Sequence, residues 1–126
     1  MDYLLGIDIG TSGTKTVLFS KIGQVIESAT VEYPLYQPKN GWAEQRPSDW
    51  WEAVVLTIQQ VLSKSGINSG EIKGIGLSGQ MHGLVMLDKE GKVLRLSIIW
   101  CDQRTAKECE EITAKVGGER YMNPQK

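Results

Sequence analysis

A carboxylate and a turn of small residues lie next to each other near the start of the chain. Asp8 is the one acid in an apolar run, and a turn rich in glycine, threonine and serine follows it. Small residues let backbone N–H groups approach phosphate oxygens closely, and a carboxylate beside them can hold a hydrated Mg²⁺. The pattern indicates nucleotide-dependent phosphoryl chemistry. The residues placed to contact phosphates are Gly10, Thr11, Ser12, Gly13 and Lys15.

Each of these residues also has an ordinary structural explanation. Asp8 can cap a turn at the end of a strand, and threonine and serine suit any hairpin. Lys15 can be a solvated lysine on a strand. Composition alone leaves the functional and the structural interpretation of Asp8 equally open.

A second candidate is the polar break at residues 79–83, which contains His82, the only histidine of the chain. Gln80 and His82 offer hydrogen-bonding groups, and Met81 offers an adaptable apolar contact. This mixture suits a polyol or a sugar. A lone histidine is more often structural or solvated than catalytic, and no cysteine is spaced to build a zinc site with it.

A third candidate is the run Trp-Cys-Asp-Gln-Arg at residues 100–104. Trp100 can stack on the apolar face of a sugar or simply fill the core. Asp102 is expected to be a helix N-cap. Arg104 is expected either to bind an anion or to pair with a nearby acid.

The elements that must position these residues form a mixed α/β pattern. Three strands in an antiparallel meander, a long helix, further strands and a second helix are expected, which is not a regular βαβαβ order. The expected strands are 3–9, 14–20, 24–33, 72–78, 84–88, 92–95 and 97–100. The first expected helix has Pro47 in its first turn and ends at Gly66, and the second runs from about 103 to 115.

The first helix has the clearest signals. Pro47 suits its first turn, Asp49 and Glu52 form a candidate capping box, and Gly66 is placed to end it. Its expected apolar stripe is Trp51, Val54, Val55, Ile58, Val61 and Leu62, and the stripe of the second helix, which Gly117 and Gly118 close, is Ala106, Cys109, Ile112 and Val116. Trp42 and Trp50 are interpreted as packing residues.

Composition and charge exclude several classes of partner. With 14 Lys and Arg against 15 Asp and Glu, the net charge is −1, which gives no reason to expect nucleic acid or an anionic membrane. The apolar runs are shorter than the roughly 20 residues that span a bilayer. Two cysteines do not make a disulfide framework, so free thiols in a cytoplasmic protein are expected.

One formal Gly-x-Gly-x-x-Gly match, residues 74–79, is rejected as a dinucleotide site because a further strand, not a helix, is expected after it. Glycines in a strand more simply indicate close backbone packing. The chain has no Walker-type phosphate-binding loop.

Several motifs together resemble the N-terminal part of FGGY-type carbohydrate kinases, and most closely the xylulokinase branch. They are Gly-Ile-Asp-Ile-Gly-Thr-Ser at 6–12, Trp-Ala-Glu-Gln at 42–45, Asp-Trp-Trp at 49–51, Gly-Gln-Met-His-Gly at 79–83 and Trp-Cys-Asp-Gln-Arg-Thr at 100–105. They occur in family order up to about Gly118. The first motif is shared with the wider actin-like superfamily, whereas the last two are much more specific. The resemblance implies an actin-like (ribonuclease H-like) ATPase domain with a mixed sheet and flanking helices.

The resemblance also implies a reaction, in which ATP and Mg²⁺ phosphorylate the 5-hydroxyl of D-xylulose. Asp8 matches the family's acid near the metal and the phosphates. Thr11, Ser12 and Lys15 match its first phosphate loop. The sugar-binding positions that match are Met81 and His82, with Trp100 as a further residue of the sugar pocket.

The family's catalytic base is an Asp of a later motif, and its second domain supplies the adenosine site. Neither lies within residues 1–126, so we expect the chain to be about the first half of the first domain of a two-domain enzyme and, alone, not a competent kinase. Three alternatives stay open: another kinase of the family such as gluconokinase, an actin-like assembly module without sugar chemistry, and a non-catalytic fragment. An unpaired sheet edge or an exposed helix stripe would favour a homodimer.

Overall fold

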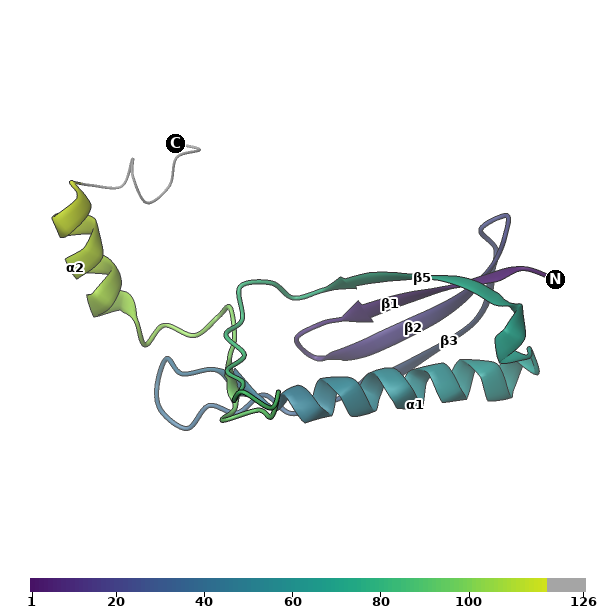
Figure 1. Ribbon diagram of the computed structural model, residues 1–126, viewed down its shortest axis with the longest axis horizontal. Helices are drawn as coiled ribbons and strands as arrows, with labels where there is room; N and C mark the ends of the chain where they lie inside the picture. Colours follow the sequence, from purple (N-terminus) through teal and green to yellow (C-terminus); the bar gives the residue numbers. More distant parts are fainter. Residues whose placement is uncertain (118–126) are drawn as a thin grey trace.

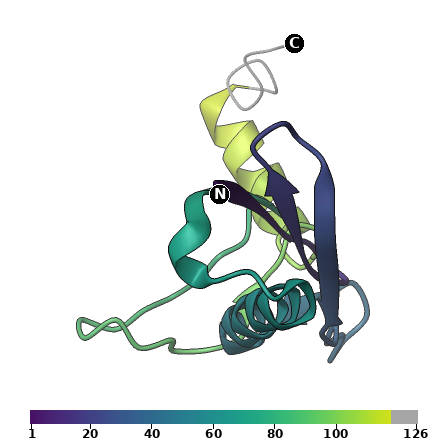
Figure 2. The ribbon, with the colours of Figure 1, turned by 90° about the vertical axis from the view of Figure 1, so that its right-hand side faces the viewer.

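The computed structural model describes residues 1–117, in which one long helix covers one face of a four-stranded sheet (Figures 1 and 2). The strand order is β3-β2-β1-β5, and β4 pairs with β6 in a second, two-stranded sheet. The elements are β1 (Tyr3–Ile9), β2 (Gly13–Ser20), β3 (Val25–Glu32), β4 (Glu44–Gln45), α1 (Pro47–Ser65), the 3₁₀ turn η1 (Ser69–Glu71), β5 (Ile72–Gly79), β6 (Ser97–Ile98) and α2 (Ala106–Val116).

The predicted meander is confirmed, because β1 pairs antiparallel with β2, and β2 pairs antiparallel with β3. The chain then crosses over through α1 and returns as β5, which pairs parallel with β1. A parallel pair requires such a long crossover. The register places Ile9 opposite Gly79, so β1 and β5 end at the same edge of the sheet. The two polar segments that follow them, 10–13 and 79–83, therefore leave the sheet side by side.

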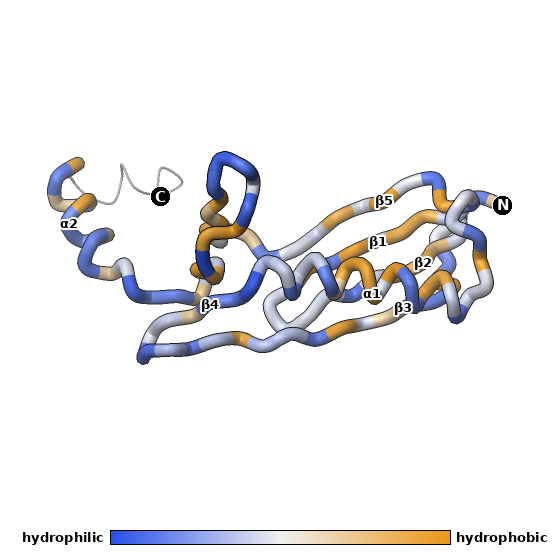
Figure 3. Tube along the Cα trace, turned by 60° about the horizontal axis from the view of Figure 1, so that its bottom comes forward, coloured by the Kyte–Doolittle hydropathy of each residue, from blue (hydrophilic) through white to orange (hydrophobic). Residues whose placement is uncertain are grey.

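The core lies between α1 and the β1–β3 part of the sheet. Leu5 and Leu18 pack there against Val61, and Figure 3 shows apolar positions gathered along α1, β1 and β5. A buried pair of hydroxyls, Thr16 and Thr57, shares a hydrogen bond of 2.7 Å within this core. Thr57 also donates to the carbonyl of Ala53, so both hydroxyls of this pair have hydrogen-bond partners.

The predicted stripe of α1 is only partly right. Val61 is buried as predicted, but Trp51 is 70% exposed, and the other fully buried positions are Ala53 and Thr57. Small side chains at i, i+4 and i+8 let the helix lie close to the strands. Hydrophobic periodicity favoured the larger residues and therefore missed Ala53 and Thr57, whereas the predicted Ile58 packs partly buried against the core.

The ends of α1 follow proline and glycine chemistry. Arg46 is the N-cap residue without a side-chain cap, Pro47 opens the helix as predicted, and the capping box of Asp49 with Glu52 is wrong. Proline needs no N–H partner at this first position, so the helix begins before the expected capping residue. Gly66 adopts φ 73° and ends the helix as predicted.

The segment between β5 and β6 contains turns where strands were expected. The predicted strands 84–88 and 92–95 are wrong, because only isolated bridges form there, between Leu87 and Val93 and between Leu84 and Ile98. The turn at Asp88 is confirmed, since the Asp88 carboxylate accepts the N–H groups of Glu90 and Lys92. The predicted strand 97–100 is reduced to Ser97–Ile98.

Helix α2 projects away from the sheet (Figure 1) and has no buried residue. It begins at Ala106, with Thr105 as N-cap residue, so the predicted start near 103 and the capping role of Asp102 are wrong. Gly117 ends the helix as predicted, with φ 94°, whereas Gly118 lies outside the described residues. Cys101 and Cys109 are free thiols. Within residues 1–117, the length and apolarity of the helices fall short of what a membrane span requires.

An ionic cluster explains why Asp102 is not a helix cap. Its carboxylate accepts the Ala43 N–H at 2.6 Å and pairs with Arg104 at 2.7 Å, and Arg104 also reaches Glu44 at 2.7 Å. The Arg104 guanidinium lies 3.7 Å from the ring centroid of Trp42, which packs over it as expected. Arg95 completes the cluster by pairing with Glu44. Of the two roles expected for Arg104, pairing with acids is therefore the one observed, and it ties β4 to the segment after β6.

The ionic cluster predicts a specific dependence of stability on pH. Hydrogen bonds from the Arg104 side chain lower the pKa of Asp102 to about 2. A lowered pKa in the folded state means that the stabilisation is complete above the ordinary carboxyl pKa and is lost as pH falls through the lowered value. The substitution Asp102→Asn should therefore reduce stability near neutral pH, and its difference from the parent should narrow between about pH 4 and about pH 2.

Urea denaturation at a series of pH values measures this difference. Asp2→Asn, at the exposed N-terminus, is the matched control and should match the parent throughout. A difference between Asp102→Asn and the parent that stays constant down to about pH 2 would contradict the assignment.

The core predicts a second outcome. Leu18 is 0% exposed between the sheet and α1, so Leu18→Ala leaves a cavity and should lower the free energy of unfolding by about 2–5 kcal/mol. Leu77→Ala, at a side chain that is 73% exposed, is the control and should cost less than about 1 kcal/mol. Urea denaturation followed by circular dichroism compares the two, and equal costs would show that the core is placed wrongly.

Candidate functional site

The turn between β1 and β2 is held in shape by Tyr33, a residue that sequence reasoning missed. The Gly10 N–H donates to the Gly13 carbonyl at 3.0 Å, and the Tyr33 hydroxyl donates to the Gly10 carbonyl. The Tyr33 N–H donates to the Ser12 carbonyl at 3.2 Å. Burial raises the pKa of Tyr33, and the nearby charge of Asp8 raises it further, whereas a hydrogen bond with Thr14 lowers it. The phenol therefore stays protonated and keeps its donor.

Gly13 is required by packing. A Cβ atom at this position would lie 2.6 Å from the carbonyl oxygen of Val31 on β3. The close approach of β2 to β3 therefore explains this glycine by itself. The same holds for Gly79, where a Cβ would lie 2.8 Å from the Ile9 carbonyl on β1. The packing interpretation of the glycines at 74–79 therefore holds for Gly79 but not for Gly76, where a Cβ would meet no atom within 4 Å.

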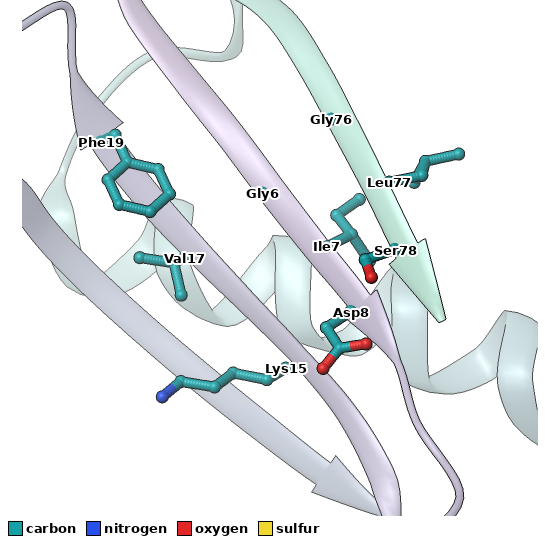
Figure 4. A pocket seen from close by; sticks show the side chains of 9 residues that line it. All are labelled: Gly6, Ile7, Asp8, Lys15, Val17, Phe19, Gly76, Leu77 and Ser78. Carbon is teal, nitrogen blue, oxygen red and sulfur yellow. The ribbon is translucent and has the colours of Figure 1, made fainter. Parts of the chain in front are cut away.

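Asp8 and Lys15 face each other across β1 and β2, on the side of the sheet opposite α1 (Figure 4). Both side chains are exposed, and the Lys15 ammonium extends away from the Asp8 carboxylate. With Ser78 of β5 they line one end of a shallow hollow, which we call the sheet-face hollow. Its lining is Gly6, Ile7, Asp8, Lys15, Val17, Phe19, Gly76, Leu77 and Ser78.

The loop after β5 carries backbone strain at His82. Its φ is +66°, the one positive value at a non-glycine residue among residues 1–117. The left-handed conformation costs an L-residue roughly 1–2 kcal/mol, and such strain is concentrated at functional sites. Both His82 and Met81 are exposed, and the Gln80 N–H donates to the Ile9 carbonyl at 2.9 Å, which fixes the start of the loop on β1.

A pocket brings the turn and the loop together, and we call it the turn–loop pocket. Its lining is Gly10, Thr11, Gly79, Gln80, Met81, His82 and Trp100. The Trp100 indole donates to the Thr11 hydroxyl at 2.8 Å, across 89 positions of the chain. Trp100 is 57% exposed and lines the pocket, so it does not fill the core.

The structure therefore divides the predicted site residues between two neighbouring hollows. Gly10 and Thr11 join Met81, His82 and Trp100 in the turn–loop pocket. Asp8 and Lys15 line the sheet-face hollow. Ser12 is exposed on the turn between β1 and β2. Gly13 lines neither hollow, and its lack of a side chain allows β2 to approach β3 closely.

Gln45 is a neighbour of the candidate site that sequence reasoning missed. It is 0% exposed, and its side chain contacts both the turn and the loop. Its position between Glu44 and the proline at the start of α1 gave no signal of this, because the contact spans distant parts of the chain. The Trp-Ala-Glu-Gln motif contains it without indicating a role.

Comparison with known proteins agrees with this geometry. Residues 3–125 match the N-terminal domain of the FGGY family of carbohydrate kinases. The match continues past Gly118, so the expectation that the resemblance ends there is wrong. The four-stranded sheet with its helices is accordingly the N-terminal portion of an actin-like (ribonuclease H-like) ATPase fold.

Individual relatives are kinases of small polyhydroxy substrates. The xylulose kinase of Bacillus subtilis is 44% identical over 93% of this chain, which spans 23% of that protein. The xylulose kinase structure from Rhodospirillum rubrum has a TM-score of 0.86 and 30% identity, covering 95% of this chain and 25% of its own. The gluconate kinase structure from Lactobacillus acidophilus has a TM-score of 0.83 and 35% identity, with 95% and 24% covered. The chain thus belongs to the FGGY family of carbohydrate kinases, whose N-terminal domain it matches.

Proposed function

We propose that the protein containing this chain transfers the γ-phosphate of ATP to the 5-hydroxyl of D-xylulose. The observation that carries the proposal is the turn–loop pocket, where the predicted phosphate residues Gly10 and Thr11 meet the predicted sugar residues Met81, His82 and Trp100. The relatives from Bacillus subtilis and Rhodospirillum rubrum, both xylulose kinases, support the choice of sugar.

On the sugar side, three side chains of different chemistry surround the pocket. The exposed ring of Trp100 offers a surface for the apolar face of a sugar. His82 can donate or accept a hydrogen bond with a hydroxyl, and its left-handed backbone fixes where the imidazole starts. Met81 supplies an adaptable apolar contact. These groups bind and orient the sugar.

On the phosphate side, the geometry narrows the donors. The Gly10 N–H is already bonded to the Gly13 carbonyl, and the Thr11 hydroxyl accepts the Trp100 indole. We therefore assign the phosphate contacts to the backbone N–H groups of Thr11 and Ser12, the Ser12 hydroxyl and the Lys15 ammonium. Phosphoryl transfer depends on such positioning and neutralisation of charge.

Asp8 fits the metal that the reaction needs. Mg²⁺ takes one or two carboxylates and completes its shell with waters and phosphate oxygens, and Asp8 offers an exposed carboxylate at the end of β1. Within residues 1–117, no three His, Cys, Asp or Glu side chains gather around a common point that could hold a metal. When bound, Mg²⁺ would neutralise charge on the phosphates. The family resemblance implies that the general base and the adenosine site belong to other parts of a two-domain protein.

A second candidate is a gluconate kinase, because the Lactobacillus acidophilus structure is 35% identical. The turn–loop pocket must then accept a carboxylate beside His82. Coupled measurement of ADP release by the complete protein with D-xylulose, D-gluconate and glycerol separates the candidates. We expect D-xylulose to give the highest kcat/KM, and a preference for D-gluconate would replace the proposal with the second candidate.

A glycine at position 82 tests the sugar role apart from folding. His82→Gly removes the steric cost of the left-handed backbone, about 1–2 kcal/mol, and adds roughly 0.5–1 kcal/mol of unfolded-state entropy. Stability should therefore be kept or rise slightly. The KM for D-xylulose should rise about tenfold because the imidazole hydrogen bond is lost, whereas the KM for ATP should stay constant.

Steady-state kinetics and thermal denaturation of the complete protein measure both quantities. Lys89→Gly, at an exposed position of the turn after Asp88, is the control and should leave both KM values unchanged. An unchanged KM for D-xylulose in His82→Gly would remove His82 from the sugar site.

A further inference from the structure

The side-chain amide of Gln45 lies fully buried between the two segments that form the turn–loop pocket. Its Nε2 donates to the Thr11 carbonyl at 2.6 Å. Its Oε1 accepts the Trp50 indole N–H at 3.0 Å and the Gln80 Nε2 at 2.8 Å. One side chain therefore contacts the turn after β1, the loop after β5 and the first turns of α1.

The orientation of this amide is fixed by Trp50. An indole N–H can only donate, so the oxygen of the Gln45 amide must face it. The NH₂ group then faces the Thr11 carbonyl, which can only accept. Because both neighbours have a single polarity, a flipped amide would set its NH₂ group against the Trp50 N–H and its oxygen against the Thr11 carbonyl, each costly when buried.

The orientation of the Gln45 amide also determines the orientation of two polar groups of the pocket, the Gln80 amide and the Thr11 hydroxyl. Gln80 donates its NH₂ to Gln45, so its Oε1 is left to face the Thr11 hydroxyl, at 3.4 Å. That hydroxyl directs its proton toward Gln80 and accepts the Trp100 indole N–H at 2.8 Å. Donation thus runs in one direction from the Trp100 indole at the rim of the pocket, through the Thr11 hydroxyl and the Gln80 amide, to Gln45 Oε1. The Trp50 indole donates to the same oxygen from the other side.

We propose that Gln45 is a positioning residue that holds the phosphate turn, the sugar loop and Trp100 in one arrangement. It lines neither the turn–loop pocket nor the sheet-face hollow, so it acts through Thr11 and Gln80. The expected effect of Gln45 on catalysis rests on the proposed function. The series of hydrogen bonds that connects Gln45 with Trp100 rests on the structure alone.

Two substitutions of similar size separate the parts of this role. Gln45→Met removes every hydrogen bond and keeps the length of the side chain. Gln45→Glu keeps the oxygen that accepts Trp50 and Gln80, but it opposes a second oxygen to the Thr11 carbonyl. Gln59→Met, on the exposed side of α1, is the matched control.

In the complete protein, Gln45→Met should raise the KM for D-xylulose about tenfold, the effect of losing about one buried hydrogen bond in the site. Gln59→Met should match the parent. When the carboxyl group of the Gln45→Glu variant is protonated, it can again donate a hydrogen bond to the Thr11 carbonyl. Burial raises the pKa of a carboxyl group, which favours this protonated form. The KM of Gln45→Glu, relative to the parent, should therefore fall as pH is lowered from about 8 to about 6. A residue that only filled space would show no such recovery.

The indole N–H resonances of ¹⁵N-tryptophan-labelled protein test the chain without any substrate, and Trp50→Phe and Trp100→Phe assign them. We expect Gln45→Met to shift both the Trp50 and the Trp100 resonances, although only Trp50 contacts Gln45. Shifted resonances with inactive parent protein would overturn the proposed function and leave the positioning role standing. The positioning role would be overturned if the Trp100 resonance did not move in either Gln45 variant. It would also be overturned if the parent protein were active and the KM of Gln45→Glu for D-xylulose, relative to the parent, did not fall at low pH.

Discussion

The parallel pairing of β5 with β1 is the constraint on which the site depends. Antiparallel strands can be joined by a short turn, whereas a parallel pair obliges the chain to cross the sheet, and α1 makes that crossing. In return, both strands end at one edge, with Ile9 opposite Gly79. The two polar segments 10–13 and 79–83, which the crossover separates in the chain, therefore lie together at that edge. Sheets of this kind bind ligands at the ends of their strands.

Strands that end at one edge do not by themselves determine the conformation of the loops that follow them. Buried polar contacts hold these loops in place. The cluster of Glu44, Asp102 and Arg104 anchors the segment that carries Trp100, and the Gln45 amide anchors the turn and the loop. Both clusters start from β4, a strand of two residues. Buried polar groups are costly unless fully paired, so each contact also excludes alternative arrangements. The strained backbone of His82 is maintained at the loop that these contacts hold.

Much of the fold followed from local patterns, because those patterns reflect local physics. Alternation and turn residues predicted the meander, and Pro47 and Gly66 marked both ends of α1. The apolar residues at 84–94 were expected to form strands because they look like strands locally, but within residues 1–117 they make only the isolated bridges of Leu84 with Ile98 and Leu87 with Val93. Trp51 was assigned to the core because a large apolar side chain outweighs Ala53 and Thr57 in any periodicity, although close helix–sheet packing prefers small ones.

The residues of the candidate site stay a prediction made from residue type and from the family resemblance. Asp8, Thr11, His82 and Trp100 were chosen because their side chains can contact a metal, a phosphate or a sugar. Gln45 and Tyr33 were missed because their importance lies in contacts between distant segments, as in the hydrogen bond from Gln45 to Thr11 across 34 positions. The expected capping role of Asp102 was wrong because its carboxylate accepts the N–H of the distant Ala43 and pairs with the neighbouring Arg104.

The most direct measurement is a crystal structure of the complete protein with D-xylulose and a non-hydrolysable ATP analogue. The central claim is that the turn after β1 and the loop after β5 form one site, with the phosphates on the first and the sugar on the second. The predicted result is a sugar that contacts His82 and Trp100, with its 5-hydroxyl directed toward the γ-phosphate at residues 10–13. A sugar bound elsewhere, with the turn–loop pocket left empty, would contradict it.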